Sequence, residues 1–272
     1  MIPLVSTKWL AENQKKVRII DASWHLPDEG RNAYEEYLNS HIVGSVFFDL
    51  DKNSKQETNI PHMLPNKENW QKLISSFGIK NDDFVVIYDN SDLISSCRCW
   101  FSFLYFGHNP NLVSVLNGGL KKWNKEKRVL TKEIVNFNRS NYLIAEKKNL
   151  IVDKNEIDKN ILSKVFEVVD ARNAKRFKGL EKEPRAGLRS GSIQGSKNLP
   201  FKFCINDDNT FKSKEELKQV FDNLKLNNSK DVIFSCGSGV TACILGLANS
   251  IISGKTPKIY DGSWAEYGLI KL

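Results

Sequence analysis

One cysteine of this chain lies where a thiolate would be stabilised. The stretch DVIFSCGSGVTACILGLA, residues 231–248, has an apolar β-branched run before Cys236, a Gly-Ser-Gly turn after it, and then apolar residues at helical spacing. This order predicts a strand, a tight turn and the start of a helix. Backbone N–H groups and the positive end of the helix dipole converge at such a turn and favour an anion. The pattern indicates a nucleophilic Cys236, with a buried core cysteine as the alternative.

The composition is that of a globular protein and gives no sign of an unusual partner. The 272 residues suffice for one large domain or two of ordinary size. The formal net charge of +8 comes from scattered lysines without interleaved aromatics, which argues against nucleic-acid binding. The chain shows no apolar run of about 18 residues and no signal-peptide pattern, and its cysteines are irregularly spaced. We therefore expect a cytoplasmic protein that binds neither nucleic acid nor a membrane.

The chain contains an internal repeat. Four pairs of segments match in the same order: 17–23 with 165–172, 41–50 with 192–201, 82–92 with 230–240, and 112–123 with 257–267. The separation from Asp21 to Asp89 is 68 residues, and that from Asp170 to Cys236 is 66 residues. One structural unit is therefore encoded twice, and its first copy has Asp89 where the second has Cys236.

Each copy of the repeat alternates short apolar strands with helical patterns. Helices are predicted at 67–77 and at 214–224, where Ser213 is a candidate N-cap. Such alternation predicts mainly parallel sheets with right-handed crossovers and helices on both faces. We therefore predict two tandem α/β domains joined by a linker rich in Asn and Lys: a first domain at 1–135, the linker at 136–148, and a second domain at 149–272.

These motifs resemble, nearly from end to end of the chain, the two-domain rhodanese superfamily of sulfurtransferases. In that family a six-residue loop of the C-terminal domain holds the catalytic cysteine, and the N-terminal domain is a catalytically silent copy. The loop Cys-Gly-Ser-Gly-Val-Thr at 236–241 is similar to that of 3-mercaptopyruvate sulfurtransferases, whereas thiosulfate-using loops typically carry Arg and Lys after the cysteine. The resemblance implies a persulfide on Cys236. It also implies a substrate-binding role for other loop residues: Gly237, Gly239, Val240 and Thr241.

Two arginines match the family's carboxylate-binding positions. The mercaptopyruvate enzymes use two arginines nine residues apart, and Arg176 and Arg185 have this spacing in AKRFKGLEKEPRAGL. A planar guanidinium group binds a carboxylate or a 2-oxo acid through two parallel hydrogen bonds. The resemblance therefore implies a clamp for a 2-oxo acid, although two solvated surface charges would be the usual interpretation of an isolated pair.

The resemblance also implies a proton relay. In mercaptopyruvate enzymes an Asp and a His of the N-terminal domain have been proposed to act with the loop serine, and Asp51, His62 and Ser238 match these positions. The relay would move a proton to or from the departing enolate or the incoming thiol. The alternative is that Asp51 and His62 only stabilise the interface between the two domains.

The sequence thus predicts an enzyme that moves sulfur from 3-mercaptopyruvate through Cys236 to an acceptor thiol or cyanide and releases pyruvate. The expected acceptor is a small thiol or a thioredoxin-like protein, and neither a cofactor nor a metal is expected. A thiosulfate sulfurtransferase and a non-enzymatic persulfide carrier stay open as alternatives. A cysteine phosphatase is excluded, because its C-x5-R motif needs arginine where this chain has Ala242. The other cysteines lack metal-ligand spacing, and Cys204 and Cys243 are predicted to be core residues.

Overall fold

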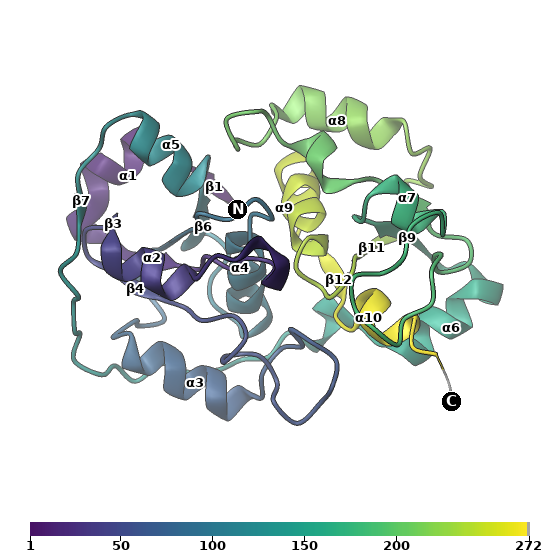
Figure 1. Ribbon diagram of the computed structural model, residues 1–272, viewed down its shortest axis with the longest axis horizontal. Helices are drawn as coiled ribbons and strands as arrows, with labels where there is room; N and C mark the ends of the chain where they lie inside the picture. Colours follow the sequence, from purple (N-terminus) through teal and green to yellow (C-terminus); the bar gives the residue numbers. More distant parts are fainter. Residues whose placement is uncertain (271–272) are drawn as a thin grey trace. The chain divides into compact units, whose positions relative to one another are not determined.

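The computed structural model describes residues 1–270, which divide into two compact units (Figure 1). The first unit comprises Met1–Gln56, Pro65–Lys147 and Asp207–Phe211. The second comprises Glu57–Leu64, Lys148–Asn206 and the described part of Lys212–Leu272. Each unit therefore includes a short segment from the other half of the chain.

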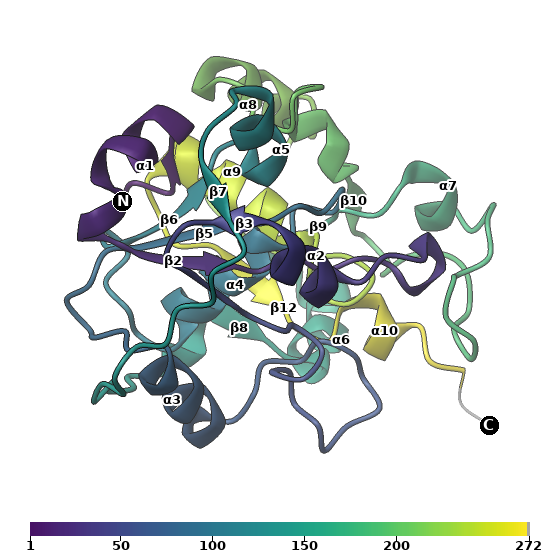
Figure 2. The ribbon, with the colours of Figure 1, turned by 60° about the vertical axis from the view of Figure 1, so that its left-hand side comes forward.

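The first unit is built on a five-stranded parallel sheet, in which β6, β5 and β2 lie side by side (Figure 2). In spatial order the strands are β1 (Leu4–Val5), β6 (Val113–Leu116), β5 (Val85–Tyr88), β2 (Arg18–Asp21) and β4 (Ser45–Phe47). The helices are α1 (Thr7–Asn13), α2 (Ala33–Asn39), α3 (Lys67–Ser76), α4 (Ser96–Tyr105) and α5 (Gly119–Lys125). Short 3₁₀ helices are η1 (Gln14–Lys16) and η2 (Pro27–Glu29), and β3 (His41–Ile42) pairs antiparallel with β7 (Leu130–Thr131). The continuous apolar run of β5 is buried throughout, as expected for a central parallel strand.

The second unit repeats this plan. Its strands in spatial order are β8 (Ile151–Val152), β12 (Lys258–Tyr260), β11 (Asp231–Ser235), β9 (Phe166–Asp170) and β10 (Lys197–Asn198). Its helices are α6 (Lys154–Ser163), α7 (Ala174–Phe177), α8 (Lys214–Asp222), α9 (Ala242–Ser253) and α10 (Ser263–Tyr267), with 3₁₀ helices η3 (Lys148–Leu150) and η4 (Phe201–Cys204). Ser213 caps α8 in a capping box with Glu216, as its position in the sequence predicted.

The two sheets have corresponding strand orders, so the predicted fold of tandem α/β domains with parallel sheets is confirmed. Hydrogen bonds after the central strands show which residues correspond. The carbonyl oxygen of Asp89 accepts a hydrogen bond from the Leu120 N–H (2.8 Å), and that of Cys236 accepts one from the Trp264 N–H (2.9 Å). Asp89 and Cys236 therefore occupy equivalent places in the two units, as the repeat predicted.

The segment after β7 contains no helix or strand, yet it is held along the first unit. The Ser140 N–H donates to the Ser75 carbonyl (2.9 Å), and the buried Tyr142 hydroxyl forms a hydrogen bond with His108 Nδ1 (3.1 Å). Most of the predicted linker, residues 136–148, is therefore anchored to the first unit by hydrogen bonds and by an aromatic side chain. Among residues 1–270, no helix combines the length and the apolar character that crossing a membrane requires.

Candidate active site

The turn between β11 and α9 is fixed by the start of α10. Cys236 is only 1% exposed, and its N–H donates to the Ser263 hydroxyl (3.1 Å). Its carbonyl accepts the hydrogen bond from Trp264 described above, and the Gly237 carbonyl accepts one from the Ala265 N–H (2.7 Å). The backbone of Cys236 and Gly237 is therefore held by three hydrogen bonds to α10.

The rest of this turn offers backbone N–H groups. Within residues 1–270, the backbone N–H groups of residues 237–241 donate to no acceptor. Gly239 has φ +78°, a conformation that favours glycine, and α9 begins directly after the turn. Free N–H groups beside a helix start bind anions, because the dipole and the donors act together. The turn can therefore accept a thiolate or a persulfide anion at Cys236.

In the equivalent turn of the first unit, the carboxylate of Asp89 occupies the place that an anion would take. The Asp89 carboxylate accepts hydrogen bonds from the N–H groups of Ser91 (2.9 Å) and Ser96 (3.0 Å), and the Asn90 N–H donates to the Ser23 hydroxyl (2.8 Å). Burial raises the pKa of Asp89 above its usual range. This turn therefore has no thiol, and a side-chain carboxylate already satisfies the donors that an anion would need.

His62 and Ser238 are brought together. His62 Nδ1 lies 2.8 Å from the Ser238 hydroxyl, and the two residues are 4% and 6% exposed. His62 has φ +62°, which is uncommon for a residue other than glycine. Two residues later, the Leu64 N–H donates to the Asp261 carboxylate (2.9 Å). This bond ties the segment that carries His62 to the turn before α10.

The third predicted relay residue, Asp51, belongs to the first unit. There its carboxylate accepts a hydrogen bond from the Trp24 indole N–H (2.9 Å), and its backbone carbonyl accepts one from the Gln56 side chain (2.8 Å). The part of Asp51 in the relay stays a prediction.

The two predicted clamp arginines converge on the residue after the cysteine. Arg176 lies on α7, and Arg185 lies in the segment that follows it. A Cβ atom placed on Gly237 would lie 3.3 Å from Arg176 Nη2 and 3.9 Å from Arg185 Nη1. A side chain at position 237 would therefore press on Arg176 and lie in ordinary contact with Arg185, so glycine leaves room for both guanidinium groups.

Sequence reasoning missed the supports of these groups. Ser263 and Trp264 hold Cys236. The guanidinium carbons of Arg172 and Arg189 lie 4.4 Å and 4.5 Å from the ring centroid of Trp264. Guanidinium groups over an indole face are stabilised by cation–π attraction. The segment 257–267 was singled out as part of the repeat, but a repeat match alone does not reveal such contacts.

The remaining cysteines differ from Cys236. Burial raises the pKa of Cys204 to about 12, and burial also raises that of Cys99 well above its usual range. Cys204 and Cys243 are buried, as predicted, and the thiol of Cys243 donates to the Gly239 carbonyl (3.1 Å). Within the described chain, no group of three or more His, Cys, Asp or Glu residues is arranged to hold a metal ion.

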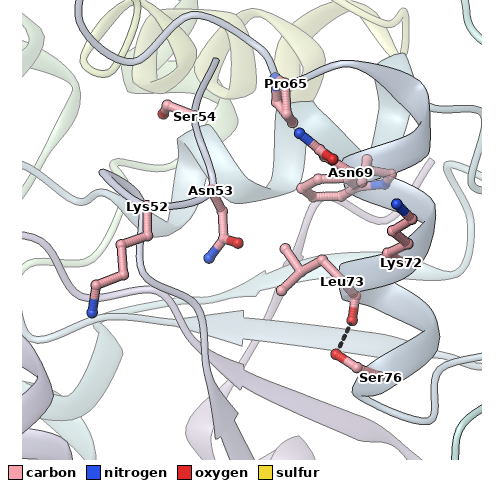
Figure 3. Close-up of a pocket in the computed structure, with 9 residues that line it drawn as sticks. Lys52, Asn53, Ser54, Pro65, Asn69, Lys72, Leu73 and Ser76 are labelled. Carbon is pink, nitrogen blue, oxygen red and sulfur yellow. Dashed lines mark hydrogen bonds between the residues drawn. The ribbon is translucent and has the colours of Figure 1, made fainter. Parts of the chain in front are cut away.

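A separate pocket of about 340 Å³ lies in the first unit, alongside α3 (Figure 3). Its lining includes Lys52, Asn53, Asn69, Lys72 and Leu73, all of them outside the unit that contains the cysteine turn. The Lys52 ammonium group is already paired with the Asp49 carboxylate (3.1 Å). This pocket is therefore distinct from the turn that carries Cys236.

Comparisons with known proteins identify the family to which this chain is similar. The Rhodanese-like domain model matches residues 6–126 and 152–269. The chain is 37% identical to the 3-mercaptopyruvate sulfurtransferase of Mus musculus and 39% identical to the thiosulfate sulfurtransferase of Bos taurus, in each case over 97% of this chain and 91% of the relative. The Escherichia coli 3-mercaptopyruvate sulfotransferase SseA has a similar structure, with a TM-score of 0.87, 32% identity, and coverage of 97% of this chain and 99% of SseA.

The tandem α/β units and the cysteine turn at the end of a central strand define a rhodanese fold, and the chain belongs to the rhodanese family. It is a two-domain sulfurtransferase of the group that contains the 3-mercaptopyruvate and thiosulfate enzymes. Relatives of both kinds are similar to this chain to nearly the same degree, so the choice of sulfur donor depends on individual residues of the site.

Proposed function

We propose that the protein transfers sulfur from 3-mercaptopyruvate, through a persulfide on Cys236, to an acceptor thiol. One observation carries this proposal: the guanidinium groups of Arg176 and Arg185 both approach Gly237, the neighbour of the cysteine. Two guanidinium groups suit a donor whose carboxylate and oxo oxygens lie a few bonds from the reacting sulfur. The rest of the turn, residues 237–241, contains no cationic side chain, although a small dianion such as thiosulfate would gain from one there.

In the first step the Cys236 thiolate attacks the thiol sulfur of the donor. An S–S bond forms, the C–S bond of the donor breaks, and its electron pair leaves on the enolate of pyruvate. The enolate gains a proton and becomes pyruvate, while the sulfur stays on Cys236 as a persulfide. No external oxidant is needed, because the transferred sulfur is oxidised as the donor carbon is reduced. The N–H groups of residues 237–241 would stabilise the anionic persulfide.

In the second step an acceptor thiol takes the outer sulfur and restores the Cys236 thiolate. The acceptor is a small thiol or a thioredoxin-like protein, and cyanide replaces it in an assay. The scheme uses no bound cofactor, metal, nucleic acid or membrane. A cytoplasmic location stays a prediction from the sequence.

The test of this proposal is the choice of donor by the purified protein. We expect kcat/KM for sulfur transfer to a small thiol to be at least about tenfold higher with 3-mercaptopyruvate than with thiosulfate, because only the former offers a carboxylate to the arginines. Initial rates with each donor measure this ratio. A preference for thiosulfate would contradict the proposal and favour the activity named for the bovine relative. If the protein showed no activity with either donor but took up sulfur from a persulfide-bearing protein, the result would favour a non-enzymatic persulfide carrier.

A second prediction concerns the contact between His62 and Ser238, to which we assign the proton movement. We expect His62→Ala and Ser238→Ala each to lower kcat about 100-fold and to remove the same limb of its pH profile. KM for the donor should change little, since the arginines remain. Ser229→Ala, which alters an exposed serine of the same unit, is the control. An unchanged pH profile in both variants would reduce the pair to a structural contact.

A further inference from the structure

One carboxylate beside the clamp arginines is buried in an otherwise exposed segment. The side chain of Glu183 is 1% exposed, whereas its neighbours Glu181 and Lys182 are exposed residues. Glu183 Oε1 accepts hydrogen bonds from Arg172 Nη1 (2.7 Å) and Arg176 Nε (3.3 Å), and Oε2 accepts one from Arg176 Nη2. A carboxylate is rarely buried in this way unless it is paired, and Glu183 bridges two guanidinium groups.

The two arginines do not depend equally on Glu183. Arg172 is also bound by the Asp170 carboxylate, with Nη2–Oδ2 2.7 Å and Nε–Oδ2 3.0 Å, and it donates to the Gly191 carbonyl (2.9 Å). Burial by itself would lower the pKa of Arg172, but its bonds to Asp170 and Glu183 raise it. Arg172 is therefore fixed and neutralised without Glu183. The carboxylate of Glu183 therefore matters chiefly for Arg176, whose Nε and Nη2 it binds.

The position of Arg176 matters because it is the clamp arginine nearer to Gly237. Its side chain is 19% exposed, so water competes for its donors and would let an unsupported guanidinium group swing away. Glu183 takes hydrogen bonds from Nε and Nη2, which fixes the plane of the group beside the turn. The formal charges of Asp170, Arg172, Glu183 and Arg176 cancel, so this chain of ion pairs adds no net charge to the site.

We propose that Glu183 is a positioning and selectivity residue: it orients Arg176 beside Gly237 and cancels its charge. This inference rests on the proposed function and assigns part of the donor preference to a residue that does not touch the donor. An orientated but neutralised Arg176 offers directed hydrogen bonds to the singly charged 3-mercaptopyruvate. A dianion such as thiosulfate depends more strongly on net positive charge, because its Coulomb energy with an added unit charge is twice as large.

The decisive variant is Glu183→Gln, which keeps an acceptor oxygen of similar shape and removes the negative charge. We expect the ratio of kcat/KM for thiosulfate to that for 3-mercaptopyruvate to rise about tenfold, since one unit of positive charge is added near the donor. The control is Glu181→Gln, the same charge change two residues earlier on an exposed side chain, and it should leave the ratio unchanged. Equal ratios in the two variants would overturn the selectivity role.

Glu183→Ala separates orientation from charge. It removes the same charge and also the acceptor, so we expect KM for 3-mercaptopyruvate to rise at least about tenfold above that of Glu183→Gln, with a smaller change in kcat. Equal KM values in the two folded variants would overturn the positioning role. If the alanine variant does not fold, because the buried Arg172 and the partly exposed Arg176 lose a shared partner, Glu183→Asp replaces it. Aspartate keeps the negative charge but is too short to hold Arg176 as Glu183 does, so KM for 3-mercaptopyruvate should rise above that of Glu183→Gln.

A binding measurement keeps this inference apart from the proposed function. Calorimetry with pyruvate and with sulfate, a monoanion and a dianion, requires no turnover. We expect Glu183→Gln to tighten sulfate binding relative to pyruvate binding by about tenfold, and Glu181→Gln to leave the ratio unchanged. If the parent lacked activity with both donors, the proposed function would fail while this ratio still tested Glu183. If the parent preferred 3-mercaptopyruvate and neither ratio moved in Glu183→Gln, the inference would fail alone.

Discussion

Cys236→Ser is expected to abolish sulfur transfer, with a loss of at least about a thousandfold in kcat from either donor. Serine fits the space and keeps the backbone bonds to Ser263 and Trp264, but its hydroxyl is not ionised near neutral pH and forms no persulfide. The parent, treated with donor in the absence of acceptor, should gain the mass of one sulfur atom on the peptide that contains Cys236. The variant should gain none.

The control for this result is a cysteine of the same unit with a different environment. Cys204 is buried in η4, and its raised pKa keeps it a protonated thiol. Cys204→Ala should therefore retain both activity and persulfide formation. Sulfur transfer that survives in Cys236→Ser, or a persulfide found on another cysteine, would contradict the proposed mechanism.

The second large effect is expected for Arg185→Ala, with a fall of about 100-fold in kcat/KM for 3-mercaptopyruvate. A hydrogen bond to a charged group contributes about 1.5–3 kcal/mol, and each 1.36 kcal/mol corresponds to a factor of ten in rate. The loss should be expressed mainly in KM, because the Cys236 turn is left intact. The rate with thiosulfate should change less, so the donor preference should collapse.

Lys175→Ala is the matched control for the clamp. Lys175 is an exposed cation next to Arg176 on α7, so its removal changes the local charge without changing the pair that faces Gly237. We expect kcat/KM in this variant to stay within about threefold of the parent, as is usual for exposed charges. A loss in Lys175→Ala as large as that in Arg185→Ala would mean that the arginine acts through general electrostatic attraction, and the clamp would have to be abandoned.

The fold was predictable because its signals are local and occur twice. The apolar runs, the N-cap at Ser213 and the turn after β11 follow from residues within a few positions of one another. The burial of Glu183 gives no such signal. The stretch KGLEKEPRAGL has the composition of a solvated surface, and only the folded chain shows which of its charges meets Arg172 and Arg176.

The segment that carries His62 gives a second example. This segment lies between β4 and α3 in the sequence, and both elements belong to the first copy of the repeat. The sequence order therefore predicts that the segment packs in the first unit. The structure groups Glu57–Leu64 with the second unit, where the Leu64 N–H reaches Asp261. Membership in a unit depends on contacts that are distant in sequence, and hydrophobic periodicity carries no information about them.

The exchange of short segments also bears on how such a chain can evolve. A duplicated gene ordinarily leaves two copies that can be lost, shuffled or fused elsewhere one at a time. Here a gene for residues 148–272 alone would encode a unit without Glu57–Leu64, and a gene for residues 1–147 alone would encode one without Asp207–Phe211. Neither half alone therefore encodes all the segments of its own unit, so we expect the two halves to be inherited together.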